Sequence, residues 1–178
     1  MAQSQQYPFE RVVISEVFGN DLLQHIYPYI YSWKLVTKDG KLEKKALCRF
    51  NVFDGPCISY FPNGNFQGVY AYKNNKLDGV FTCYYENGNL NYTLTYNLGQ
   101  KQGQYTSFFP DGKLEVQAFY DNDRPVGEVF KYYPTGGLKF ICNYENGLKN
   151  GLYSEWDEKG NIIAKVLYKN DEAKKQLL

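Results

Sequence analysis

The sequence predicts an all-β protein built as an elongated, twisted array of stacked antiparallel β-hairpins. Three observations predict it: glycines recur at a fixed step of 24 residues, turn-forming residues keep that step, and aromatic residues are abundant. Tyrosine, phenylalanine and tryptophan make up 18% of the 178 residues, and their rings pack well on pleated strands. Hydrophobic residues reach 43%, which favours a folded domain over a disordered chain.

The repeat is marked by two glycines in every copy, the second nine residues after the first. A fixed period of this length is typical of architectures that stack one small unit many times. The first glycines are Gly55, Gly79, Gly103, Gly127 and Gly151, and the second are Gly64, Gly88, Gly112, Gly136 and Gly160.

Each copy is interpreted as one β-hairpin. In the copy that begins at Gly103, residues 104–109 predict a strand and residues 114–120 predict the returning strand. The turn between them is Pro-Asp-Gly at 110–112, where proline presets φ and glycine accepts a positive φ. The tip of each hairpin is therefore expected at the second glycine.

The returning strand alternates between two faces. Leu114, Val116, Ala118 and Tyr120 share one face, and we expect this face to be the core. Phe119 is expected on the opposite face.

The repeats set the expected domain organisation. Residues 31–171 are interpreted as six hairpin repeats, of which the first is degenerate, because DGKL at 39–42 matches DGKL at 111–114. Residues 1–30 are expected to form an N-terminal cap with a short helix at 21–26, and residues 172–178 a C-terminal tail.

Charge and targeting signals exclude several classes of protein. The net charge of +1 gives no general attraction for nucleic acid, so no nucleic-acid partner is expected. The start of the chain lacks a basic and apolar signal segment, and no apolar run approaches the roughly 20 residues that span a bilayer. We expect a cytoplasmic protein.

Catalytic chemistry has little support. The one histidine, His25, lies in the expected cap, and the four cysteines lack metal-ligand spacing and are expected to be reduced. Carboxylates such as Asp111 and Asp157 lie in turns, and no phosphate-binding glycine motif occurs. We therefore expect no enzyme, no catalytic residue, no metal site and no cofactor.

The candidate binding residues are aromatic. The first strand of each copy ends in adjacent rings, which either stack on neighbouring repeats or offer a groove to a partner, since tyrosine and tryptophan are common in binding hot spots. The candidates are Tyr60, Tyr84, Phe108, Tyr132, Trp156, Phe61, Tyr85, Phe109 and Tyr133.

The run YYENGNL at 84–90 resembles the core of the MORN repeat in its variant form, and the likeness extends over residues 31–171. Typical MORN units carry a tryptophan where this chain has Tyr72 and its equivalents. The resemblance implies a single-layer hairpin array with scaffold or partner-binding roles, and some bacterial members are antitoxin- or immunity-like.

These observations together predict a non-catalytic protein that binds another protein. We expect it to occlude that partner, a toxin or an effector, as an antitoxin or immunity protein does. The alternative is a membrane-peripheral, lipid-binding scaffold built from the same repeats.

Overall fold

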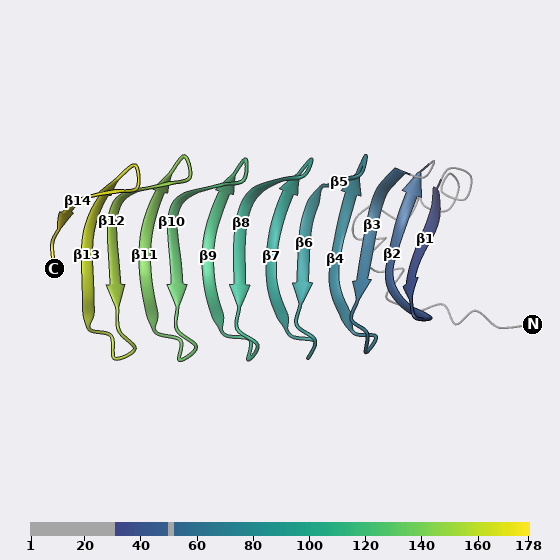
Figure 1. Ribbon diagram of the computed structural model, residues 1–178, viewed down its shortest axis with the longest axis horizontal. Helices are drawn as coiled ribbons and strands as arrows, with labels where there is room; N and C mark the ends of the chain where they lie inside the picture. The colour runs from purple at the N-terminus through teal and green to yellow at the C-terminus, as the bar shows by residue number, and fades with distance from the viewer. Residues whose placement is uncertain (1–30, 50–51) are drawn as a thin grey trace, which may run out of the picture.

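The computed structural model describes residues 31–49 and 52–178, and these residues form one antiparallel sheet without a helix. Figure 1 shows the strands side by side along the long axis of the molecule, in a single layer. The expected all-β array is confirmed, whereas the expected helix at 21–26 lies outside the described residues. The strands are β1 (Tyr31–Lys38), β2 (Lys41–Arg49), β3 (Val52–Tyr60), β4 (Phe66–Lys73), β5 (Lys76–Leu77), β6 (Gly79–Tyr84), β7 (Leu90–Asn97), β8 (Gln100–Phe108), β9 (Leu114–Asp121), β10 (Arg124–Tyr132), β11 (Leu138–Glu145), β12 (Leu148–Trp156), β13 (Ile162–Lys169) and β14 (Glu172–Gln176).

The order of strands in the sheet follows the order in the chain. Each strand pairs with the one before and the one after it, and only the two-residue β5 lies off this path, paired with β4. Such nearest-neighbour pairing is the arrangement that a repeat protein needs, because each unit contacts only its neighbours. The last strand, β14, covers most of the segment expected as a tail and pairs with β13.

The hairpin tips all lie at the same end of the strands, at the lower side of Figure 1. Gly112 has a φ of 87°, and its N–H donates to the carbonyl of Phe109 at 2.8 Å. The Asp111 carboxylate accepts from the N–H of Lys113 at 3.1 Å, so the side chain closes the same turn. The tips therefore lie at the second glycine of each repeat, as the sequence predicted. The second glycines all have positive φ: Gly64, Gly88, Gly112, Gly136 and Gly160.

At the other end of the strands, successive hairpins are joined by two hydrogen bonds between one pair of residues. We call this pair of bonds the Asx clamp. The N–H of Asp123 donates to the carbonyl of Lys101 at 3.0 Å, and the Asp123 carboxylate accepts from the N–H of Lys101 at 2.8 Å. Asn75 with Phe53, and Asp171 with Lys149, repeat the arrangement. Glycine replaces the Asx residue at Gly99 and Gly147, which keep the backbone bond, and beside Gly99 the Asp78 carboxylate accepts from the N–H of Leu98 at 3.0 Å.

The buried core of this sheet is thin. Fully buried apolar side chains are concentrated in β2 and β3, where Ala46 and Cys57 are both 0% exposed. Farther along the array the core reduces to isolated positions such as Ala118 and Cys142. The expected faces of β9 agree with this pattern, since Ala118 is buried while Phe119 on the opposite face is 49% exposed.

Replacing Asp123 tests the Asx clamp. Asp123 has a φ of 67°, so alanine there loses the carboxylate and is strained as well, whereas glycine loses only the carboxylate. We expect Asp123→Ala to lower the free energy of unfolding by about 1–2 kcal/mol, and Asp123→Gly by less. Urea unfolding followed by circular dichroism measures both. Equal stability of the two variants and the parent chain would show that the clamp contributes nothing.

Candidate binding face

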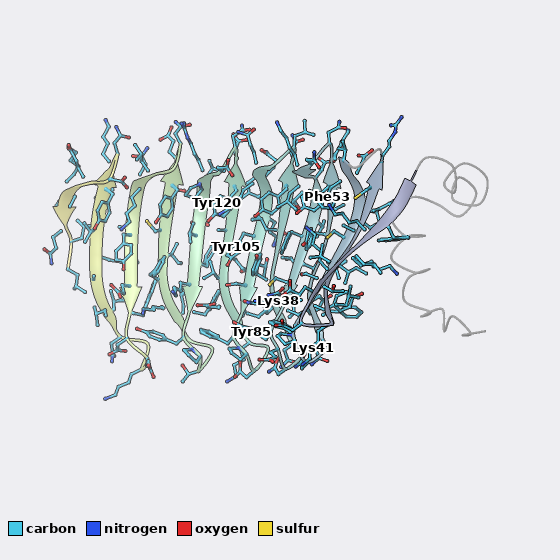
Figure 2. The ribbon with its side chains drawn as sticks, turned by 45° about the vertical axis from the view of Figure 1, so that its right-hand side comes forward. Lys38, Lys41, Phe53, Tyr85, Tyr105 and Tyr120 are labelled. Atoms are coloured by element: carbon cyan, nitrogen blue, oxygen red, sulfur yellow. The ribbon has the colours of Figure 1, made fainter. Side chains whose placement is uncertain are left out.

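The register of the strands decides which side chains share a face. Tyr105 in β8 pairs with Ala118 in β9, and Gly103 pairs with Tyr120, so Tyr105 and Tyr120 project to the same side of the sheet. We call this side the tyrosine face, and Figure 2 labels Phe53, Tyr105 and Tyr120 among its rings. Its ring-bearing residues include Phe53, Tyr70, Tyr72, Phe81, Tyr92, Tyr96, Tyr105, Tyr120, Phe140, Tyr153 and Tyr168.

Rings on the tyrosine face form a continuous run of contacts from β3 to β9. Tyr70 stacks on Phe81 with centroids 4.6 Å apart, Phe81 stacks on Tyr92 at 5.8 Å, and Tyr92 meets Tyr105 at 5.9 Å. Tyr105 then contacts the edge of Tyr120 at 6.1 Å. These separations lie in the range where aromatic pairs attract beyond simple burial. The run therefore links the hairpins through side chains as well as through backbone.

The run of rings is interrupted once. Val129 takes the place that Tyr105 holds in the preceding repeat and Tyr153 in the following one. Contacts resume beyond it, where Phe140 meets Tyr153 at 5.7 Å and Tyr153 meets Tyr168 at 6.1 Å. The tyrosine face thus consists of a longer and a shorter aromatic platform.

The nine residues expected from the sequence lie elsewhere. They are half-buried and occupy the last strand position before each hairpin tip, or the position after it, and we call them the strand-end rings. Tyr85 and Tyr133 reach the next hairpin, where their hydroxyls donate to the carbonyls of Phe108 and Trp156, both at 2.8 Å. The Tyr60 ring contacts that of Phe66 with centroids 5.6 Å apart, and the Lys139 ammonium lies 5.3 Å from the centroid of Tyr133.

Sequence reasoning placed the periodic tyrosines of the returning strands, such as Tyr120, on the core face with Ala118, and the strand register agrees. The same reasoning missed that their ring partners come from the middle of the first strands, at Phe81, Tyr105 and Tyr153. The signal was available, because these three positions keep the 24-residue step and lie two residues after the first glycine of their repeats.

Lysines lie over the rings of the tyrosine face. The Lys44 ammonium is 4.7 Å from the centroid of Phe53 and 4.9 Å from that of Tyr72, whose hydroxyl it also contacts at 3.3 Å. Lys101 lies 5.3 Å from the Tyr120 ring, and Lys149 lies 5.0 Å from the ring of Tyr168. These are cation–π distances, so the ammonium groups are held at the ring faces.

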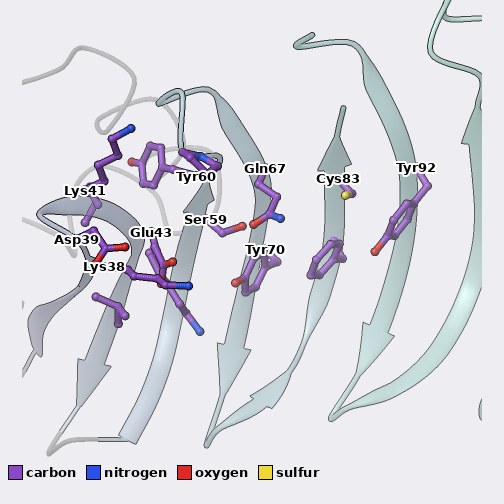
Figure 3. A pocket seen from close by; sticks show the side chains of 15 residues that line it. Lys38, Asp39, Lys41, Glu43, Ser59, Tyr60, Gln67, Tyr70, Cys83 and Tyr92 are labelled. Carbon is purple, nitrogen blue, oxygen red and sulfur yellow. The ribbon is translucent and has the colours of Figure 1, made fainter. Parts of the chain in front are cut away.

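A groove of about 840 Å³ opens at the N-terminal end of the tyrosine face. Figure 3 shows side chains from β1–β4, β6 and β7 around it. Tyr70 and Tyr92 belong both to its lining and to the run of stacked rings, so the groove continues the tyrosine face. Its charged lining is mixed: Lys38, Lys41 and Lys44 with Asp39 and Glu43.

Burial perturbs the hydroxyls and thiols of this region. It raises the pKa of Tyr92 to about 12, with a smaller contribution from nearby Cys83. Burial also raises the pKa of Tyr70 and of the Cys57 thiol, its close neighbour. Each shift favours the neutral form, so these groups are suited to donating hydrogen bonds rather than to acting as nucleophiles.

The carboxylates at the hairpin tips serve the turns. Asp157 accepts from the side chain and the N–H of Asn161 and from the N–H of Lys159, and these bonds hold its pKa below the usual value. A hydrogen bond from the N–H of Lys113 does the same for Asp111. In the part of the chain that the structure describes, no cluster of three or more histidine, cysteine or acidic residues could hold a metal ion.

These features define a one-layer β-repeat protein with an aromatic, lysine-bearing face. The family model described as "MORN repeat variant" matches residues 77–98, 101–122, 125–146 and 149–170, which correspond to four successive hairpins. The chain belongs to the MORN-repeat family in this variant form. No curated protein matches it. Among the described residues, no helix has the length and apolar character needed to cross a membrane.

The contribution of the stacked rings can be measured by comparing two phenylalanines. Phe81 contacts Tyr70, Tyr92 and Tyr96, whereas Phe119 is 49% exposed on the opposite face. We expect Phe81→Ala to lower the free energy of unfolding by about 2–3 kcal/mol and Phe119→Ala by less than about 1 kcal/mol. Denaturant titration reports both, and similar losses in the two variants would contradict a special role for the ring contacts.

Alkaline pH should weaken the fold through Tyr92. Its pKa is raised from 10.0 to about 12, so its stabilising contribution is complete below pH 10 and is lost as pH rises towards 12. We expect the free energy of unfolding to fall over this interval, and to fall less steeply in Tyr92→Phe, which cannot ionise. Urea titrations at a series of alkaline pH values measure the slope. An unchanged slope in the variant would contradict the assignment.

Proposed function

We propose that this chain is a non-catalytic scaffold that binds another protein and occludes it, in the manner of an antitoxin or immunity protein. The observation that carries the proposal is the aromatic surface, which extends over successive hairpins on one face of a single-layer sheet. No second layer of described residues covers that face (Figure 1). A partner can therefore contact many repeats at once.

The chemistry of the surface supports protein binding. Tyrosine and tryptophan lose little conformational entropy when they are buried, and they dominate binding hot spots. The ring contacts hold Phe81 and Tyr105 in place before any partner arrives, which lowers the cost of association. The strand-end rings add a second aromatic row beside the hairpin tips, and we propose that they form the rim of the same surface.

The family also supports a role without catalysis. MORN repeats act in general as binding modules, and the turn carboxylates of this chain are engaged by turn hydrogen bonds. We propose a cytoplasmic site of action, with a toxin or an effector as the partner and no cofactor.

A membrane-peripheral role is the second candidate, and the lysines over the rings favour it. Lys44, Lys101 and Lys149 lie on one face, where anionic headgroups could meet them. Flotation with vesicles that contain anionic lipid separates the two functions. Binding to such vesicles that is lost at high salt would support the membrane role.

Capture of a partner tests the proposed function. We expect the full chain to retain a specific protein from its native host. The triple variant Tyr85→Ser, Phe109→Ser, Tyr133→Ser changes strand-end rings on the side of the tyrosine face and should lose at least tenfold of that capture. The matched control changes three exposed apolar side chains of the opposite face, Val80→Ser, Phe119→Ser and Leu152→Ser, and should retain it.

Circular dichroism must show that both triple variants remain folded. Undiminished capture by the folded strand-end variant would remove the strand-end rings from the binding surface. Neutralisation of the captured protein's activity by the full chain is the measurement that supports occlusion, and unchanged activity would contradict it.

A further inference from the structure

The tyrosine face carries lysines that no carboxylate of the described residues pairs with in a salt bridge. Lys34, Lys44, Lys101 and Lys149 project to this face, and within residues 31–49 and 52–178 they form no salt bridge with a carboxylate. Their ammonium groups rest on rings instead. A carboxylate from another molecule could pair with them without displacing an existing ion pair.

The acidic groups of the same face do not cancel this charge. Glu115 lies 3.9 Å from the Lys131 ammonium, and Glu155 accepts a hydrogen bond from the Tyr153 hydroxyl at 2.7 Å. Glu115 is paired with a lysine, whereas the hydrogen bond from Tyr153 leaves the charge of Glu155 in place. The carboxylates of Asp123 and Asp171 lie at the Asx clamps, beside Lys101 and Lys149. The four lysines without a salt bridge outnumber these three carboxylates, so the face keeps a small cationic excess and the complementary ligand is acidic.

The distance between Lys101 and Lys149 indicates which backbone conformation such a ligand would adopt. Lys101 lies in β8 and Lys149 in β12, four steps apart in the sheet, which corresponds to about 19 Å at the usual strand spacing. A polyproline II chain rises about 3.1 Å per residue, so six residues cover roughly the same distance. Because it has three residues per turn, residues six apart point the same way.

The advance of the sheet per hairpin also matches the rise of one polyproline II turn. One hairpin advances the sheet by about 9.6 Å, and one polyproline II turn advances by about 9.3 Å. Every third residue of such a chain would meet an equivalent position in the next hairpin. A β-strand ligand gains no comparable match, because a sheet face offers no row of backbone groups with which a strand could pair.

The rings beside each of the two lysines suit the other positions of the ligand. Tyr105 and Tyr120 meet edge to face, and Tyr153 and Tyr168 repeat that arrangement two hairpins farther on. Aromatic surfaces of this kind accept prolines, and tyrosine hydroxyls can donate to the exposed carbonyls of a polyproline II chain. The face therefore combines apolar contact, hydrogen-bond donors and cations in a repeating order.

We propose that the tyrosine face binds an acidic, proline-rich segment of a partner protein, laid across the strands in polyproline II conformation with carboxylates at Lys101 and Lys149. The proposal rests on the proposed function and specifies the chemistry of the partner. It assigns the ion pairs to the two lysines and the apolar contacts to the tyrosines beside them.

The test uses the full chain and a fluorescein-labelled synthetic peptide with glutamate at every sixth position and proline between. Fluorescence anisotropy measures its binding at low and at high salt. One control peptide carries lysine in place of glutamate, and another keeps the glutamates but has glycine and serine in place of proline. We expect saturable binding of the first peptide, weakened by salt, and at least fivefold weaker binding of both controls.

Two double variants locate the site. Lys101→Gln with Lys149→Gln should weaken binding of the glutamate peptide about tenfold. The matched control, Lys159→Gln with Lys165→Gln, removes the same charge from a hairpin tip and from the opposite face and should leave binding unchanged. Circular dichroism of each variant verifies the fold.

Several results would overturn the inference. They are absence of saturable peptide binding, equal loss in the two double variants, or binding to anionic vesicles with none to the peptide. Self-association in sedimentation that disappears in the Lys101 and Lys149 variant would assign the face to a second copy of the chain. Full capture of the host partner by that same variant would leave the proposed function standing and remove this inference alone.

Discussion

A sheet of one layer has to be held together by contacts between neighbouring hairpins, because neither face is covered by a second layer of described residues. Successive hairpins are bound by the strand ladder and by side chains at the tips. At the other end of the strands they are bound by the Asx clamp or, at Gly99 and Gly147, by its backbone bond. These bonds join residues about one repeat apart, so the length of the repeat is itself a structural constraint. An insertion within one copy would put both the tip contacts and the Asx clamp out of register.

The aromatic rings also hold neighbouring hairpins together, through side-chain contacts on the tyrosine face. Where a two-layer protein would bury its apolar side chains between sheets, this chain packs rings against rings along the array and places lysine ammonium groups over them. Stability and the proposed recognition therefore rely on the same residues. Phe81 and Tyr92, for example, support the sheet and also line the groove.

The fold was largely predictable from the sequence, because glycine period, turn residues and strand alternation all specify one arrangement of hairpins. The location of the ring contacts was harder to predict. Adjacent rings such as Tyr84 and Tyr85 are conspicuous in the sequence, yet contact across strands depends on register, which brings Phe81 to Tyr92 instead. The Asx clamp was missed for a similar reason, since Asp123 and Lys101 become neighbours only when hairpins stack.

The array should twist more easily at Val129 than elsewhere, although its backbone is regular there. At this position a small β-branched side chain replaces a ring, so the hairpins on either side are joined without the stacking found elsewhere. Torsion of the sheet should concentrate there, because twisting costs fewer contacts at that point than at any fully stacked junction. The molecule would then present two stiff plates with a compliant joint, able to adjust their relative angle to a curved partner.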